Sequence, residues 1–132
     1  MVREKVYLRI YGESFNPKKI IEETGNIFCE YNSVGDIGKR GRFKNKPLPY
    51  GSATIEPPNK IEEYKKIMWL IEFTKKNLAI IQKYGGDDIT FKVVYYYKNQ
   101  CNCELSVKAM KGLIELNLPF VFSVYEDGFY PD

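Results

Sequence analysis

Apolar and polar residues alternate along two segments of the chain, which is the period expected of β-strands. In residues 6–12 one side carries Val6, Leu8 and Ile10, and the other side carries Tyr7, Arg9 and Tyr11. In residues 89–97 one side carries Ile89, Phe91, Val93, Tyr95 and Tyr97. Both segments are predicted to be half-buried strands. Further strands are predicted at 27–31, 48–56, 101–105 and 120–126, with a glycine- and lysine-rich loop at 32–47.

Two short helices are predicted from the residues that begin them. The first follows Asn16-Pro17, with Asn16 as its predicted cap, and is ended by Gly25. Its inward residues are predicted to be Ile20 and Ile21. The second is capped by Ser106 and continues to about residue 116. Its predicted buried residues are Val107, Met110, Leu113 and Ile114.

The longest helix is predicted over residues 60–84, between Asn59 as its cap and Gly85-Gly86 as its end. Its main apolar face consists of Tyr64, Ile67, Ile71, Leu78 and Ile81, with Thr74 between them. A second apolar set lies nearly opposite and consists of Trp69, Phe73 and Ile80. Either residues 32–58 pack over this second set, or it is an exposed patch that binds a partner. The sequence leaves both alternatives open.

These elements follow one another in the order β-α-β-β-α-β-β-α-β along a chain of 132 residues. That length fits one compact domain spanning residues 1–132. The order predicts an α+β fold with three helices and a mixed, mainly antiparallel sheet, the helices lying largely on one face. The order of the strands within the sheet does not follow from the sequence.

The chain contains no histidine, which removes Ser-His and Cys-His nucleophile pairs and the commonest general base. No spacing of the other ionisable residues matches a catalytic motif, so we expect no enzyme, no catalytic residues and no cofactor. Cys29, Cys101 and Cys103 are expected to be free thiols rather than metal ligands, because structural zinc takes four ligands. We find no secretory signal and no apolar run that could span a bilayer, so a cytoplasmic location is expected.

Positive charge is concentrated in one loop. The net charge is +3, and the whole excess lies in residues 1–58, which hold ten basic and seven acidic residues. Residues 39–46, here called the basic loop, carry Lys39, Arg40, Arg42, Lys44 and Lys46 and no acidic residue. Such a cluster can bind nucleic-acid phosphates or an acidic protein, and it is also common as a solvated surface loop.

Tyrosines and cations alternate on the side of the predicted sheet that faces away from the helices. The residues expected there are Tyr7, Arg9, Tyr11, Lys92, Val94, Tyr96 and Tyr125. In principle this composition suits a platform on which nucleic-acid bases stack. It is also ordinary for an antiparallel sheet with one half-exposed face.

Three short motifs together suggest a family. Residues 8–12 run Leu-Arg-Ile-Tyr-Gly and are followed by Asn16-Pro17; Gly35-Asp36 opens the basic, glycine-containing loop; and residues 104–106 lead through a helix into the apolar strand 120–125. In these motifs the chain resembles a divergent member of the bacterial family known as domain of unknown function 4279. The resemblance implies no catalytic residues. Small bacterial proteins of this kind are sometimes encoded beside toxins as immunity proteins.

The function predicted from the sequence is therefore that of a non-enzymatic protein-binding module, such as an immunity protein that binds and neutralises a cognate bacterial toxin. The predicted partner-binding residues are Trp69, Phe73, Ile80, Lys39, Arg40, Arg42, Lys44 and Lys46. The alternative is a nucleic-acid-binding module that uses the basic loop and the tyrosine-rich sheet face. No membrane partner is expected, and the sequence does not indicate an oligomeric state.

Overall fold

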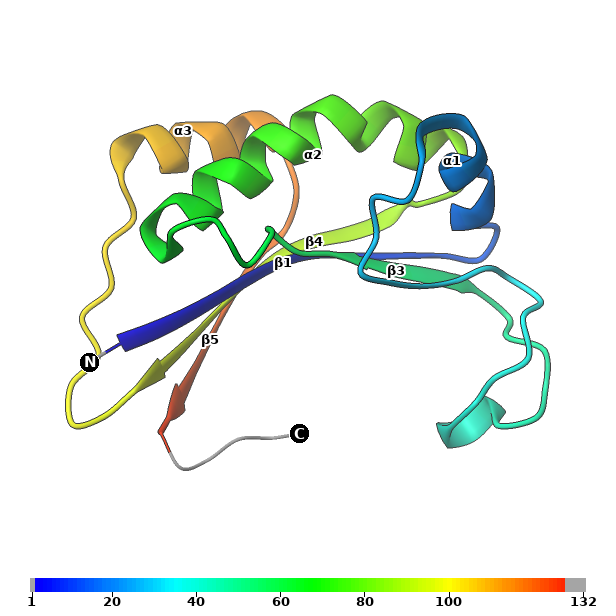
Figure 1. The fold of residues 1–132 in the computed structure, drawn as a ribbon, viewed down its shortest axis with the longest axis horizontal. Helices are drawn as coiled ribbons and strands as arrows, with labels where there is room; N and C mark the ends of the chain where they lie inside the picture. Colours follow the sequence, from blue (N-terminus) through cyan, green and yellow to red (C-terminus); the bar gives the residue numbers. More distant parts are fainter. Residues whose placement is uncertain (1, 128–132) are drawn as a thin grey trace.

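A computed structural model describes residues 2–127 and shows three helices on one face of a five-stranded sheet (Figure 1). The strands are β1 (Val2–Gly12), β2 (Glu30–Asn32), β3 (Gly51–Ile55), β4 (Asp88–Tyr97) and β5 (Phe120–Glu126). The helices are α1 (Pro17–Thr24), α2 (Lys66–Lys83) and α3 (Val107–Leu116). Short 3₁₀ turns occur at Gly41–Phe43 and Glu63–Lys65. Among these elements, no helix combines the length and the apolar character needed to cross a membrane.

The strand order is β2-β3-β1-β4-β5, and the only parallel pair in this described sheet is β4 with β5. The helix α3 connects these two strands, which is the crossover that a parallel pair requires. The centre of the sheet is the antiparallel pair of β1 and β4, in which Leu8 lies opposite Phe91 and Ile10 lies opposite Ile89. The predicted α+β class, with a mainly antiparallel mixed sheet and helices on one face, is confirmed.

The core lies between the sheet and the helices. The predicted apolar sides of β1 and β4 are both buried there, with Leu8, Ile10, Phe91 and Val93 fully excluded from solvent. The side chains that meet them from the helices include Ile20 of α1 and Leu70, Ile71 and Ile81 of α2. Side chains buried at every second position of the strands therefore pack against side chains buried every three or four positions along the helices, and together they form one core.

The long helix begins six residues later than predicted. Asn59 does not cap it; a turn and a 3₁₀ segment precede α2, whose first residue is Lys66. Tyr64 therefore falls outside the helix and is exposed rather than part of its buried face. Leu70, which lies one helical turn after Ile67, is buried with it. The predicted end at Gly85-Gly86 agrees with a helix that stops at Lys83.

Two further expectations are wrong. Residues 101–105 form no strand, because β4 already pairs with β1 on one edge and with β5 on the other, so no free edge remains beside it. The predicted buried face of α3 is also wrong: Val107, Met110 and Ile114 are exposed, and Leu113 is only half-buried. The helix instead buries Ala109, Gly112 and Leu116. The predicted Ser106 cap is confirmed, since its hydroxyl accepts a hydrogen bond from the Ala109 N–H at 3.0 Å.

Candidate binding surfaces

The basic loop lies on the open face of the sheet, the side opposite the helices (Figure 1). There it borders a cleft of about 530 Å³ together with the ends of β1, β2 and β3. We call this hollow the open-face cleft. The residues that line it are Arg9, Tyr11, Glu30, Tyr31, Asn32, Gly38, Lys39, Arg40, Leu48, Tyr50 and Ser52. The cleft thus brings two cations of the basic loop beside the tyrosine-rich end of the sheet.

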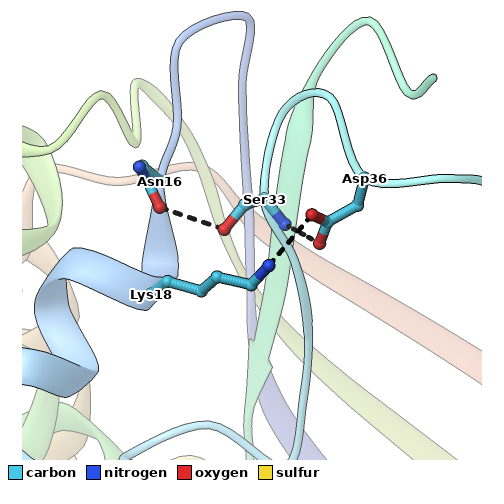
Figure 2. Close-up of polar contacts among 4 residues, drawn as sticks. All are labelled: Asn16, Lys18, Ser33 and Asp36. Carbon is cyan, nitrogen blue, oxygen red and sulfur yellow. Dashed lines mark hydrogen bonds and ion pairs between the residues drawn. The ribbon is translucent and has the colours of Figure 1, made fainter.

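Four polar residues tie the base of this loop to the start of α1 (Figure 2). The Ser33 hydroxyl donates to Asn16 Oδ1 at 3.0 Å, and the Ser33 N–H donates to Asp36 Oδ2 at 2.9 Å. Lys18 Nζ lies 3.1 Å from Asp36 Oδ1. We call Asn16, Lys18, Ser33 and Asp36 the polar clasp. Asn16 therefore occupies the cap position of α1 without capping it, because its side chain bonds to Ser33 instead.

The clasp also sets the charge state of Asp36. Burial alone would raise the pKa of this carboxyl, but the Ser33 N–H and the Lys18 ammonium outweigh that effect and lower the pKa below its ordinary value. Asp36 thus remains an anion that holds a neighbouring N–H and a cation in place. Its main chain adds to the attachment, since the Leu48 N–H donates to the Asp36 carbonyl at 2.7 Å.

The basic loop is a tight, internally bonded hairpin rather than an open coil. The Gly38 N–H donates to the Lys46 carbonyl, and the Asn45 N–H donates to the Gly38 carbonyl, both at 2.8 Å. A β-carbon at Gly38 would lie 2.2 Å from the Phe43 carbonyl oxygen, so only glycine allows the two strands of the loop to approach this closely. Lys39 and Arg40 are therefore presented to the cleft by an ordered backbone.

The charged groups of the cleft are three cations and one carboxylate. Arg9 Nε donates to the Tyr11 hydroxyl at 2.7 Å, and Arg40 forms an ion pair with Glu30 at 3.8 Å. Burial opposes the charge of Arg9, but the hydrogen bond to Tyr11 and the nearby acidic groups outweigh it and raise the pKa of the guanidinium. With Lys39 as the third cation, the cleft has a net positive charge and suits an anionic group.

Only part of the predicted basic cluster reaches this site. Lys39 and Arg40 line the cleft, whereas Arg42 lies over the ring of the adjacent Phe43, at 5.5 Å from its centroid. Lys44 and Lys46 are exposed and do not line the cleft. Sequence reasoning missed Glu30, Tyr31 and Tyr50. Tyr31 and Tyr50 lie on either side of the loop in the sequence, and this placement was the signal from which their presence at the site could have been predicted.

The rest of the open face differs from a bare base-stacking platform. Cations already lie over several tyrosine rings, with Arg3 4.6 Å from the ring centroid of Tyr96 and Lys5 5.6 Å from that of Tyr7. Val94 is buried although it lies on this face. A nucleic-acid base could stack on these tyrosines only after it displaced the cations.

The second apolar set of α2 is divided in the structure. Trp69 and Phe73 stack with a centroid distance of 4.8 Å and line a hollow of about 460 Å³, whose wall includes Lys108 of α3. Ile80 does not line that hollow. None of the lining residues comes from residues 32–58, and the basic loop lies at the opposite end of the molecule from the start of α2 (Figure 1). Residues 32–58 therefore do not cover the Trp69 hollow.

A third hollow, of about 700 Å³, lies between α3 and the start of β5 and is mainly apolar. Its lining residues include Met110, Leu113 and Ile114 of α3 and Phe120 of β5. It contains no titratable side chain. Such a groove suits an apolar partner surface rather than a charged ligand.

The three cysteines form no recognisable centre. Cys101 Sγ and Cys103 Sγ lie 3.3 Å apart, and Cys29 donates to the Thr54 carbonyl elsewhere. Burial, with the neighbouring Cys101 thiol, raises the pKa of Cys103 to about 11, which disfavours the nucleophilic thiolate at neutral pH. Within residues 2–127, no three His, Cys, Asp or Glu side chains gather where they could hold a metal ion.

Comparison with known proteins adds no relative: no protein-family model, curated protein or solved structure matches the chain. The candidate sites are therefore compared by their geometry, and the open-face cleft is the one that joins three tyrosines with cations from both the sheet and the basic loop.

Proposed function

We propose that the protein is a non-enzymatic protein-binding module whose partner presents an acidic surface to the open-face cleft. The observation that carries this proposal is the meeting of Arg9, Lys39 and Arg40 with three tyrosines in one concave site. Tyrosine and arginine are the residue types enriched at the centres of protein interfaces, where they supply apolar contact and directed hydrogen bonds together.

The rigidity of the site supports this function. The polar clasp and the hairpin bonds of the basic loop fix the cleft before any partner arrives. A preorganised site loses little conformational entropy on binding, so more of the interaction energy appears as affinity. The positive charge would also speed the approach of an acidic partner.

The resemblance to the bacterial family suggests which kind of protein the partner is. Small bacterial proteins of this kind are sometimes encoded beside toxins, so the proposed partner is a cognate bacterial toxin. The protein would then act as an immunity protein by covering a functional surface of that toxin. The net positive charge of the cleft fits a toxin with an acidic binding face, rather than a basic nuclease of the kind that acidic inhibitors bind.

Single-stranded nucleic acid is the second candidate, because its phosphates would also find Arg9, Lys39 and Arg40 in the cleft. The protein partner is favoured because cations already lie over the tyrosine rings Tyr7, Tyr11 and Tyr96. In a protein interface these cation–ring pairs can stay in place, whereas base stacking would disrupt them.

The test is co-purification and affinity measurement with the product of the adjacent gene, comparing Arg40→Ala with Lys46→Ala. Both substitutions remove one exposed cation of the same loop, but only Arg40 lines the cleft. We expect Arg40→Ala to weaken binding by about 2 kcal/mol or more, and Lys46→Ala to change it little. No binding by the wild type, or equal losses in both variants, would count against this function.

A parallel titration with single-stranded RNA and DNA separates the two candidates. Nucleic-acid binding would fall steeply as salt rises, because bound phosphates release counterions. Affinity for oligonucleotides with that salt dependence, and none for the protein, would replace the proposed function with the second candidate.

A further inference from the structure

The apolar stripe of α3 faces away from the core. Val107, Met110 and Ile114 recur three and four residues apart, which is the spacing of a buried helix face. Yet Ile114 is 77% exposed and Val107 is 63% exposed. The helix packs its narrow side, with Ala109 and Gly112, toward the core instead. A stripe with the pattern of a buried face thus lies uncovered in the part of the chain that the structure describes.

Beside this stripe, β5 forms an edge of the sheet, and no described residue pairs with its outer side. The Phe91 N–H of β4 donates to the Pro119 carbonyl at 2.9 Å. In a parallel ladder, successive residues turn their backbone groups alternately toward and away from the neighbouring strand. The backbone N–H and C=O groups of Phe122 and Val124 therefore point outward, where another strand could bond to them.

The stripe and the edge strand form one continuous surface. Phe122 and Val124 lie on the helix side of β5 and are 49% and 51% exposed. Phe122 contacts the ring of Phe120 at a centroid distance of 4.3 Å, and Phe120 lines the groove that Met110 and Ile114 border. We call Val107, Met110, Ile114, Phe122 and Val124 the α3–β5 surface.

We propose that the α3–β5 surface is the interface of a homodimer, in which β5 pairs antiparallel with β5 of a second copy. The size of the surface supports this occupant. A standard interface covers about 800 Å² of each partner, of which about 500 Å² is apolar in a homodimer. The five exposed side chains together offer roughly 450 Å² of apolar surface on each copy, which is close to that requirement.

The strand is also complementary to itself. A two-fold axis at Ser123 places Phe122 opposite Val124 of the second copy. The outward N–H and C=O groups of Phe122 can then bond to those of Val124 in the other copy. Residues 120–125 carry no charge, so two copies of the strand do not repel each other. The same axis brings the two α3 stripes to one side of the joined sheet. Each copy thereby covers the apolar face that the other exposes.

This dimer does not rest on the proposed function, because the two surfaces share no residue. The open-face cleft lies at the β2–β3–β1 end of the sheet, and β5 is the opposite edge. Loss of the dimer would therefore leave the cleft intact, and loss of partner binding would leave the dimer intact.

The test is sedimentation equilibrium of the full chain over a series of concentrations. The first variant is Ile114→Lys, with Ile37→Lys as its matched control, since Ile37 is an exposed isoleucine in the loop that follows β2. The second variant is Val124→Pro, which removes an outward N–H together with the valine side chain and leaves the bonds from β5 to β4 in place. Thermal unfolding of each variant checks that it remains folded.

The expected result is a wild type whose mass rises with concentration from one chain to two. Ile114→Lys and Val124→Pro should each raise the dissociation constant at least about tenfold, and Ile37→Lys should leave it unchanged. A wild type that stays monomeric at every concentration would overturn the proposal, and would leave the surface to a foreign partner. A dimer that neither variant weakens, or that Ile37→Lys weakens equally, would overturn it as well.

Discussion

Gly112 of α3 lies so close to Ile71 of α2 that a β-carbon at Gly112 would be 2.8 Å from Ile71 Cγ2. This contact sets the rotation of α3. The side of α3 that carries Ala109, Gly112 and Leu116 faces the core, so Ile114, on the other side of the helix, is exposed. The near contact joins the two helices that are adjacent above the sheet.

We expect Gly112→Ala to lower the free energy of unfolding by up to about 2 kcal/mol. The substitution adds helix propensity worth about 1 kcal/mol, but overpacking against a buried β-branched side chain costs about 1–3 kcal/mol. Ile71→Leu removes the Cγ2 methyl, so the double variant should lose less than the sum of the two single changes. Denaturant titration measures all three variants, and a Gly112→Ala protein more stable than the wild type would contradict the contact.

Two isoleucines on neighbouring helices provide a matched pair for testing burial. Ile71 is fully buried, whereas Ile114 is 77% exposed. Ile71→Ala should lower the free energy of unfolding by about 2–5 kcal/mol, because it removes buried methyl groups and leaves a cavity. Ile114→Ala, measured at a concentration where the protein is monomeric, should change it by less than about 0.5 kcal/mol. Similar losses at both positions would show that α3 is rotated differently.

Local patterns predicted much of this fold. The alternation of Val6, Leu8 and Ile10 identified the buried side of β1, because strand burial has a period of two wherever one face is covered. The Ser106 cap was also predicted, since a cap depends only on residues within one turn. The rotation of α3 was not predicted. Whether the side with Gly112 or the side with Ile114 is buried depends on how closely α2 approaches α3.

The binding site was predicted only in part for a similar reason. The charges of Lys39 and Arg40 are visible in the sequence, and so are Arg9 and Tyr11 as residues of one strand face. Their meeting with Tyr50 depends on β3 lying beside β1, and strand order does not follow from local periodicity. Asn16 was predicted to cap α1 from its local sequence, but its side chain accepts a hydrogen bond from Ser33 instead. This contact depends on the tertiary fold.

The polar clasp predicts a dependence of stability on acid. The pKa of Asp36 is lower in the folded protein than its ordinary value near 4, so the carboxylate stabilises the fold above that value. This stabilisation is lost as pH falls through the lowered pKa. Asp36→Asn should reduce the free energy of unfolding by about 1–2 kcal/mol near neutral pH, and the difference from wild type should shrink below about pH 4.

Denaturant titrations of both proteins between about pH 7 and pH 3 measure this difference. Glu13→Gln supplies the control, because Glu13 is an exposed carboxylate close in sequence to the clasp. A difference between wild type and Asp36→Asn that stays constant to the lowest pH would contradict the assigned role of the carboxylate.

The fluorescence of Trp69 tests whether a partner binds at the Trp69 hollow or elsewhere, including the α3–β5 surface. It is half-buried and stacked on Phe73, so its emission should be intermediate between that of a buried and that of a fully exposed tryptophan. Because Trp69 lines neither the open-face cleft nor the hollow between α3 and β5, its emission should shift little when a partner or a second copy binds. A clear blue shift on mixing with the partner would instead assign the Trp69 hollow to the interface. Trp69→Ala, which removes the fluorophore, should then weaken that association by about 2 kcal/mol or more.

The central strand pair has a consequence for synthesis on the ribosome. In β1, Leu8 pairs with Ile55 on one side and with Phe91 on the other. Among the strands that the structure describes, the earliest to leave the exit tunnel is therefore the middle strand of the sheet. At about 5–20 residues per second, its second neighbour follows only after roughly 4–16 s. During that interval an apolar strand with an open edge is exposed on the nascent chain, where a chaperone could bind it before β4 emerges.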